Sequence, residues 1–182
     1  MTAVAAAITL SACSSADDSA SAPASSTSTR ATTSAAASST SNANAPLAPG
    51  SEITVGSEKD AAISARIVVH SVTQEAAPNA PRPVSGGHWA AIDVQTCVDK
   101  SNVPFTVGWD TWTLADANYG NYPASNLTYN QFPKPLYPFG SQTVAVGDCV
   151  RGSILFPIPD GVTITRVKYN PNPKLSATWS AT

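Results

Sequence analysis

The 182-residue chain is poor in charge, histidine and long apolar runs, and each shortage excludes a class of protein. Charged residues make up 12% of the chain and its formal net charge is −2. Because neither sign forms a run, the basic stripe of a nucleic-acid-binding domain is missing. No stretch of about 18 apolar residues predicts a membrane-spanning helix. Two histidines, neither at metal spacing from a second ligand, lead us to expect no metal and no cofactor.

Signatures of catalysis are missing as well. No serine stands in a G-x-S-x-G or S-x-x-K pattern. Asp93, Asp99, Asp110 and Asp116 are the remaining candidates, because glycoside hydrolysis needs two carboxylates at a separation that the fold sets. Residues 116–120 (DANYG) fit a calcium loop poorly and a hairpin turn well. We therefore expect that the protein is not an enzyme.

The amino terminus reads as an export signal. Residues 3–10 (AVAAAITL) are apolar, and residues 10–13 read Leu-Ser-Ala-Cys. This tetrad resembles the lipobox of bacterial prolipoproteins, whose cysteine thiol receives a diacylglycerol and whose signal is cut just before it. The resemblance implies a signal peptide at 1–12, a lipidated Cys13 and a permanent membrane anchor. No Lys or Arg precedes the apolar run, so we expect the true start to lie upstream of Met1.

Residues 13–45 predict a disordered tether. All but six of the 32 residues after Cys13 are Ser, Thr or Ala, and such a segment has too little apolar surface to offset its ordering entropy. As a flexible coil it would span roughly 30 Å. Composition changes at Pro46, and the 137 residues of 46–182 suit one globular domain.

In residues 46–182, short runs of β type alternate with turn residues. Apolar and polar side chains alternate with a period of two in the four clearest runs, 63–70, 89–99, 149–156 and 175–179. Shorter candidates are 53–55, 105–114, 143–146 and 162–169. In the last of these the apolar parity switches, which predicts a bulge near Thr165 and Arg166. About seven or eight strands without helical periodicity predict an all-β, Ig-like β-sandwich; a small closed barrel is the alternative.

Four segments of this domain resemble Ig-like lipoprotein domains of actinobacteria, a group that includes small secreted mycobacterial immunogenic antigens. The segments are 87–102 (GHWAAIDVQTCVDKSN), 112–122 (WTLADANYGNY), 146–161 (VGDCVRGSILFPIPDG) and 167–171 (VKYNP). Together they reach across most of residues 50–171. The resemblance implies an Ig-like sandwich and a domain of unknown function, with no catalytic residues to transfer.

Cys97 and Cys149 remain as a pair once the first cysteine is lipidated, and export favours their oxidation. Each lies on the less apolar face of its run, one with Asp93 and the other with Arg151. We therefore expect a disulfide between neighbouring strands of one sheet, on its outer face. Closing this loop would stabilise the domain by roughly 4 kcal/mol. The spacing is not C-x-x-C, which argues against a redox-active pair.

Aromatic residues are concentrated between positions 119 and 139, where four prolines interrupt them. The six aromatic residues are Tyr119, Tyr122, Tyr129, Phe132, Tyr137 and Phe139. This segment is too irregular for a strand and long for an ordinary loop. Rings on a proline-stiffened backbone supply contact area at low entropic cost, which favours a ligand-binding surface. The alternative is that the rings plug the open end of the sandwich and cover a sheet edge.

Together these features predict an exported cell-envelope lipoprotein, anchored extracytoplasmically to the membrane, that presents a non-enzymatic Ig-like binding module. Its partner would be an envelope or host protein or a glycan. A structural or accessory role in support of a membrane complex is the first alternative. An enzyme that acts on wall glycans through converging aspartates is the second.

Overall fold

The fold of the domain follows from strands whose side chains alternate between core and solvent. The computed structural model describes residues 45–56, 62–83, 86–172 and 175–182. The predicted signal peptide, Cys13 and nearly all of the predicted tether lie outside these residues and remain predictions. Every regular element in the described ranges is a strand. The same ranges hold no helix with the length and apolarity that a membrane span requires.

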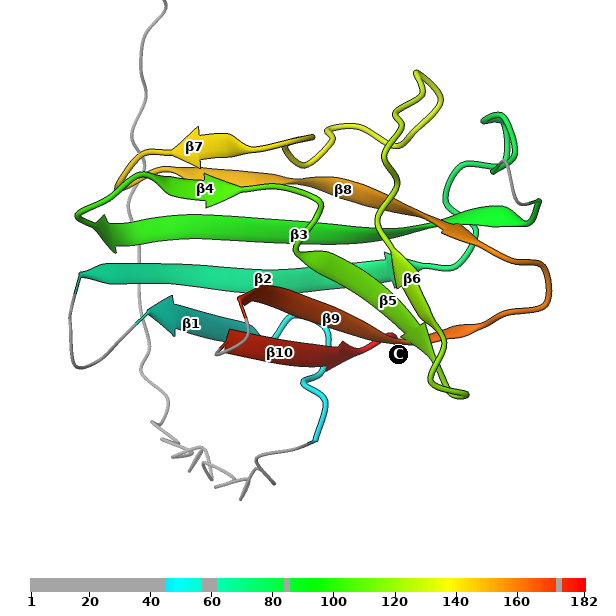
Figure 1. The fold of residues 1–182 in the computed structure, drawn as a ribbon, viewed down its shortest axis with the longest axis horizontal. Coiled ribbons are helices and arrows are strands. Elements are labelled where there is room, and N and C mark those ends of the chain that lie inside the picture. Colours follow the sequence, from blue (N-terminus) through cyan, green and yellow to red (C-terminus); the bar gives the residue numbers. More distant parts are fainter. Residues whose placement is uncertain (1–44, 57–61, 84–85, 173–174) are drawn as a thin grey trace, which may run out of the picture. The chain divides into compact units, whose positions relative to one another are not determined.

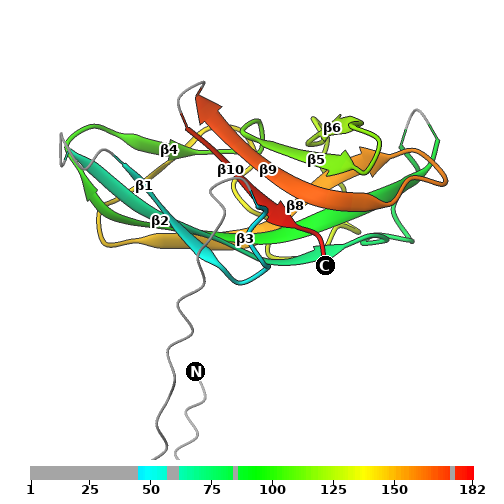
Figure 2. The same ribbon diagram turned by 90° about the horizontal axis from the view of Figure 1, so that it is seen from below.

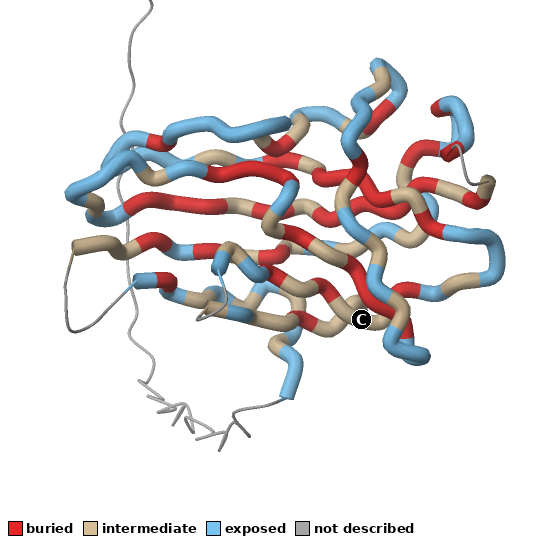
Figure 3. Tube along the Cα trace, viewed as in Figure 1, coloured by how far each residue is buried: buried red, intermediate tan, exposed pale blue. Residues whose placement is uncertain are grey.

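One four-stranded antiparallel sheet, sheet 1, has the order β1-β2-β3-β8 (Figure 1). Its strands are β1 (Glu52–Gly56), β2 (Ile63–Thr73), β3 (His88–Ser101) and β8 (Cys149–Ile158). Ile67 and Val69 of β2, and Ile92 and Val94 of β3, are buried at alternate positions, which turns one face of sheet 1 to the core. Buried and less buried residues alternate along the middle of β2, whereas β3 is buried over longer stretches because parts of its outer face are covered as well (Figure 3).

A second antiparallel sheet, sheet 2, has the order β10-β9-β5-β6. Its strands are β5 (Trp112–Asp116), β6 (Asn121–Pro123), β9 (Ile164–Asn172) and β10 (Leu175–Ser180). Trp112, Val167 and Trp179 point into the core and are almost fully buried. The register between β5 and β9 skips one residue, because Ala115 faces Arg166 whereas the next residue of β5 faces Ile164. The bulge predicted near residues 165–166 is confirmed.

The two sheets form the layers of a sandwich that encloses the core (Figure 2). The predicted all-β sandwich is therefore confirmed. The described ranges contain ten strands rather than seven or eight, because three of the ten are only three residues long. Two of these short strands, β4 (Phe105–Val107) and β7 (Gln142–Val144), pair in a sheet of their own. Each contributes one valine, Val107 or Val144, to the core.

Two crossing segments connect the sheets along the sides of the sandwich. Leu47 forms a parallel bridge with Trp179 of β10, and its amide donates to the Thr178 carbonyl at 2.8 Å. The chain then enters β1 of sheet 1. At the other end of sheet 2, β6 leads to Ser125, whose amide donates to the Leu155 carbonyl of β8 at 2.8 Å. These crossings occupy backbone groups that edge strands would otherwise expose.

Candidate functional site

The six aromatic residues predicted to bind a ligand do not share one surface. Phe132 and Tyr137 are buried, each with 2% of its surface exposed. Tyr122 and Tyr129 are half-buried. Tyr119 and Phe139 are exposed. The two exposed rings lie on different segments, at the β5–β6 hairpin and before β7. We therefore leave Phe132 and Tyr137 out of any contact surface.

Part of the aromatic segment covers one end of the outer face of sheet 1. Trp89 of β3 points away from the main core, yet only 5% of it is exposed. Tyr129 and Phe132 pack against it edge to face, with ring centroids 6.0 and 5.0 Å away. The Trp89 indole N–H donates to the Pro81 carbonyl at 2.7 Å. These rings form a small apolar cluster outside the sheet.

The chain then wraps round the free edge of β8. Leu136 forms a parallel bridge with Ser153, and a Cβ at Gly152 would collide with the Leu136 backbone. Tyr137 turns into the core, where its hydroxyl shares a 2.8 Å hydrogen bond with Thr96 Oγ1. Burial raises the pKa of Tyr137 above its usual range. This part of the segment covers a sheet edge, which is the alternative to ligand binding.

An open groove of about 600 Å³ lies where the β4–β5 loop meets the segments that follow β6 and precede β7. Trp109 forms a buried wall of the groove, fixed by a 2.8 Å hydrogen bond from its indole N–H to the Tyr137 carbonyl. Phe139 packs edge-on against it at 5.1 Å and leaves half of its surface exposed. Asp110 and Asn126 also line the groove. Aromatic surface beside a carboxylate and an amide suits a molecule with both apolar and hydroxyl-bearing faces, such as a sugar ring.

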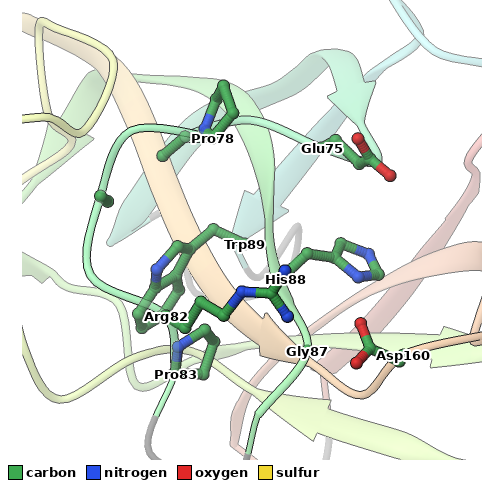
Figure 4. A pocket seen from close by; sticks show the side chains of 10 residues that line it. Glu75, Pro78, Arg82, Pro83, Gly87, His88, Trp89 and Asp160 are labelled. Carbon is green, nitrogen blue, oxygen red and sulfur yellow. The ribbon is translucent and has the colours of Figure 1, made fainter.

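A smaller pocket of about 220 Å³ lies beside Trp89 (Figure 4). Its lining includes Glu75 and Arg82 of the β2–β3 connection, His88 at the start of β3, and Asp160 of the distant β8–β9 turn. Figure 4 shows the His88 ring between the two carboxylates in this view. Within the described ranges, no hydrogen bond or ion pair joins these four side chains, and all but the half-buried histidine are exposed. The pocket has room for a small polar molecule, but water competes for each of its charges.

Asp116 is engaged in the turn between β5 and β6. Its Oδ1 accepts hydrogen bonds from the amides of Asn118 (2.8 Å) and Gly120 (2.7 Å). Its Oδ2 accepts a hydrogen bond from the Tyr122 hydroxyl at 2.7 Å. The Tyr122 hydroxyl, together with the two amides, holds the pKa of Asp116 below its ordinary value. Residues 116–120 therefore form the expected hairpin turn.

The four aspartates considered for catalysis occupy four separate places. Asp93 and Asp99 form ion pairs with arginines on the outer face of sheet 1, at 2.6 and 2.9 Å. Asp110 lines the groove and Asp116 caps the hairpin. Among the described residues, no three His, Cys, Asp or Glu side chains are grouped closely enough to hold a metal ion. That the protein is not an enzyme stays a prediction.

Cys97 and Cys149 form a disulfide between β3 and β8. They lie directly opposite each other in the register, with their Cα atoms 4.0 Å apart. Their side chains share the outer face of sheet 1 with Gln95 and Arg151. The predicted pairing and its place on an outer face are both confirmed.

No family model matches the chain, and no curated protein matches it in sequence. Among solved structures, the secreted protein MPT63 from Mycobacterium tuberculosis is 18% identical with a TM-score of 0.53, over 75% of this chain and 98% of its own. The yjhA protein from Bacillus subtilis is 14% identical with a TM-score of 0.47, over 75% and 99%. The Bacillus subtilis candidate lipoprotein ycdA is 15% identical with a TM-score of 0.42, over 72% and 39%. The similarity to MPT63 shows that the chain shares the fold of a secreted mycobacterial protein.

Proposed function

We propose that the protein is an exported, lipid-anchored envelope protein that presents a non-enzymatic binding module. The Cys97–Cys149 disulfide supports export, because such bonds persist in oxidising compartments. The lipobox-like residues 10–13 support attachment at Cys13. MPT63, which has the same fold, is a secreted protein, in keeping with that location.

The groove beside Trp109 and Phe139 is the proposed ligand site, and the half-exposed Phe139 ring carries this proposal. A phenylalanine that leaves half of its surface in water forgoes the gain of full burial. Here the ring is held edge-on against a fixed tryptophan, next to the polar side chains of Asp110 and Asn126. Such a wall can stack on the C–H face of a sugar while the polar groups bond its hydroxyls. We take an uncharged sugar of an envelope glycan as the ligand.

Location is tested by intact mass and cell fractionation. The native protein should sit in the membrane fraction and begin at an acylated Cys13. A Cys13→Ala variant should leave that fraction, because it lacks the thiol that carries the lipid anchor. A native polypeptide that keeps Met1 and a free thiol at position 13 would contradict the anchor.

Binding is tested with purified peptidoglycan sacculi freed of anionic polymers. Phe139→Ala should weaken retention about tenfold or more, the usual effect of removing a central aromatic contact. Val146→Ala is the matched control, since Val146 is equally exposed (54%, against 50% for Phe139) and does not line the groove. Equal retention of both variants would eliminate the groove as the site. If the native protein does not bind sacculi, the result favours the accessory role.

A further inference from the structure

The outer faces of the two sheets differ in the partners of their cations. On sheet 1, the Arg66 guanidinium lies 2.9 Å from Asp99 and 3.4 Å from Glu52. Arg151 lies 2.6 Å from Asp93. Each of these arginines is therefore neutralised by at least one carboxylate from a neighbouring strand.

On sheet 2, the register places Arg166 and Lys168 on the outer face, because Val167 and Tyr169 point into the core. Arg166 Nη2 donates to the backbone carbonyl of Asp116 at 3.0 Å. Lys168 Nζ donates to the side-chain oxygen of Asn121 at 2.7 Å. Both acceptors are neutral. In the part of the chain that the structure describes, neither cation has a carboxylate within 4.0 Å.

The strand neighbours that flank these two cations in the register are uncharged and mostly carry hydroxyl groups. The adjacent β5–β6 turn holds a carboxylate, Asp116, whose pKa the charge of Arg166 helps to lower. Thr113 of β5 and Thr178 of β10 flank Lys168 in the register. Ala115 and Ser180 flank Arg166 in the same way. We call the surface formed by Thr113, Arg166, Lys168, Thr178 and Tyr119 the cationic face.

Tyr119 stands at the rim of the cationic face in an unfavourable conformation. Its φ is +68°, in the left-handed region, where an ordinary side chain costs about 1–2 kcal/mol. The ring is 81% exposed, and its centroid is 5.8 Å from the Arg166 guanidinium carbon. The Asp116 hydrogen bonds to this turn hold the conformation in place. Local strain of this kind is concentrated at binding sites, and here it keeps an aromatic ring in water beside Arg166.

We infer that the cationic face binds an acidic polysaccharide, as a second site distinct from the groove. The two cations project from alternate residues of one strand, roughly 7 Å apart, and would pair with successive anionic groups of the polymer. The threonine hydroxyls would bond sugar hydroxyls, and Tyr119 would stack on a sugar ring. A membrane surface fits less well, because Tyr119 is the one large apolar side chain that this face exposes.

The test uses the full-length chain with Cys13→Ala, and polygalacturonate as the probe. The protein should bind polygalacturonate, lose most of that affinity as salt rises from about 50 to 500 mM, and ignore neutral dextran. Arg166→Gln with Lys168→Gln should weaken binding about tenfold or more.

Two further variants separate binding from folding and from net charge. Tyr119→Gly should weaken binding about threefold or more with no loss of melting temperature, because glycine favours a positive φ. Arg66→Gln with Arg151→Gln removes the same charge from sheet 1 and should leave binding unchanged. The Phe139→Ala variant should also bind normally, so this result stands apart from that for the groove.

Four outcomes would overturn the inference. One is no polygalacturonate binding by the parent chain, and another is unchanged binding after the double substitution on sheet 2. Equal losses from the two double variants would show that net charge alone is responsible. Binding to anionic phospholipid vesicles in preference to polygalacturonate would assign the face to a membrane instead.

Discussion

The outer faces of sheets 1 and 2 are built from the same alternating strands, yet they handle polar side chains in opposite ways. Sheet 1 pairs its arginines with carboxylates and is cross-linked by a disulfide. Sheet 2 pairs its cations with neutral oxygens and holds an exposed tyrosine at its rim. A chain of near-zero net charge can therefore still present a locally positive surface. Strand register, which places the partners, decides where that surface lies.

The largest effect should come from removing the disulfide of sheet 1. Cys97→Ala with Cys149→Ala should lower the free energy of unfolding by about 4 kcal/mol, because the bond closes a long loop in the unfolded chain. Denaturant unfolding measures the loss. Polygalacturonate binding should persist wherever the variant is folded, since the cationic face lies on the other sheet. A loss below about 1 kcal/mol would mean that other contacts already constrain the loop.

The stability of the core between the two sheets should depend on alkaline pH. Burial raises the pKa of Tyr169 in β9 to about 12 and raises that of Tyr137 as well, against about 10 in an unfolded chain. The unfolded chain therefore releases these protons first as pH rises. The stability that the neutral phenol of Tyr169 confers is complete below pH 10 and is lost between about pH 10 and 12.

Tyr169→Phe checks this dependence. The variant should reduce the fall in unfolding free energy across that interval by about 2–3 kcal/mol, as two pKa units imply. Denaturant unfolding at successive pH values measures it, with the variant at pH 8 as the reference for lost packing. If the unfolding free energy falls with pH equally steeply in the native protein and the variant, Tyr169 ionises as freely in the folded domain as in the unfolded chain.

The smallest effect concerns the Asp116 turn of sheet 2. Its lowered pKa means that the stabilisation is present above the ordinary value near 4 and is lost as pH falls through the folded value. Tyr122→Phe removes the largest cause and should move the Asp116 titration midpoint upward. The Gly120 amide shift in NMR reports it, because that amide bonds the carboxylate. On sheet 1, Arg66→Gln should likewise raise the midpoint of Asp99. An unchanged midpoint in either variant would remove that partner as the cause.

Period-two alternation was enough to predict the faces of β2, β3 and β8, and with them the outer-face disulfide. The switch of apolar parity between Ile164 and Val167 predicted the bulge in β9. The three-residue strands β4, β6 and β7 could not be delimited, because so few residues show no clear period. The segment 105–114 accordingly contains β4, a loop and most of β5.

The candidate sites were harder to predict because exposure depends on distant segments. Trp89 lies on the outward parity of β3, yet Tyr129 and Phe132 cover it from forty residues away or more. The aromatic residues between positions 119 and 139 are close together in the sequence, yet some of them are buried and others are exposed. The cationic face left a faint signal, namely Arg166 and Lys168 alternating with Val167 and Tyr169. Only the pairing of β9 with β5 and β10 shows that their registered strand neighbours are uncharged.

The bridge between Leu47 and Trp179 determines how a mechanical load on the amino end enters the domain. A pull on the chain before Leu47 meets two backbone hydrogen bonds to β10, at 2.8 and 2.7 Å. Behind them stands the fully enclosed Trp179 ring, whose indole N–H is secured to the Ser51 carbonyl at 2.9 Å. Tension therefore divides at Leu47: the hydrogen bonds carry part of it into β10 and its neighbour β9, and the backbone carries the rest into β1 of sheet 1. A polymer bound by Arg166 and Lys168 would be connected to the pulling chain through β10 and β9, two strands that the disulfide of sheet 1 does not cross-link.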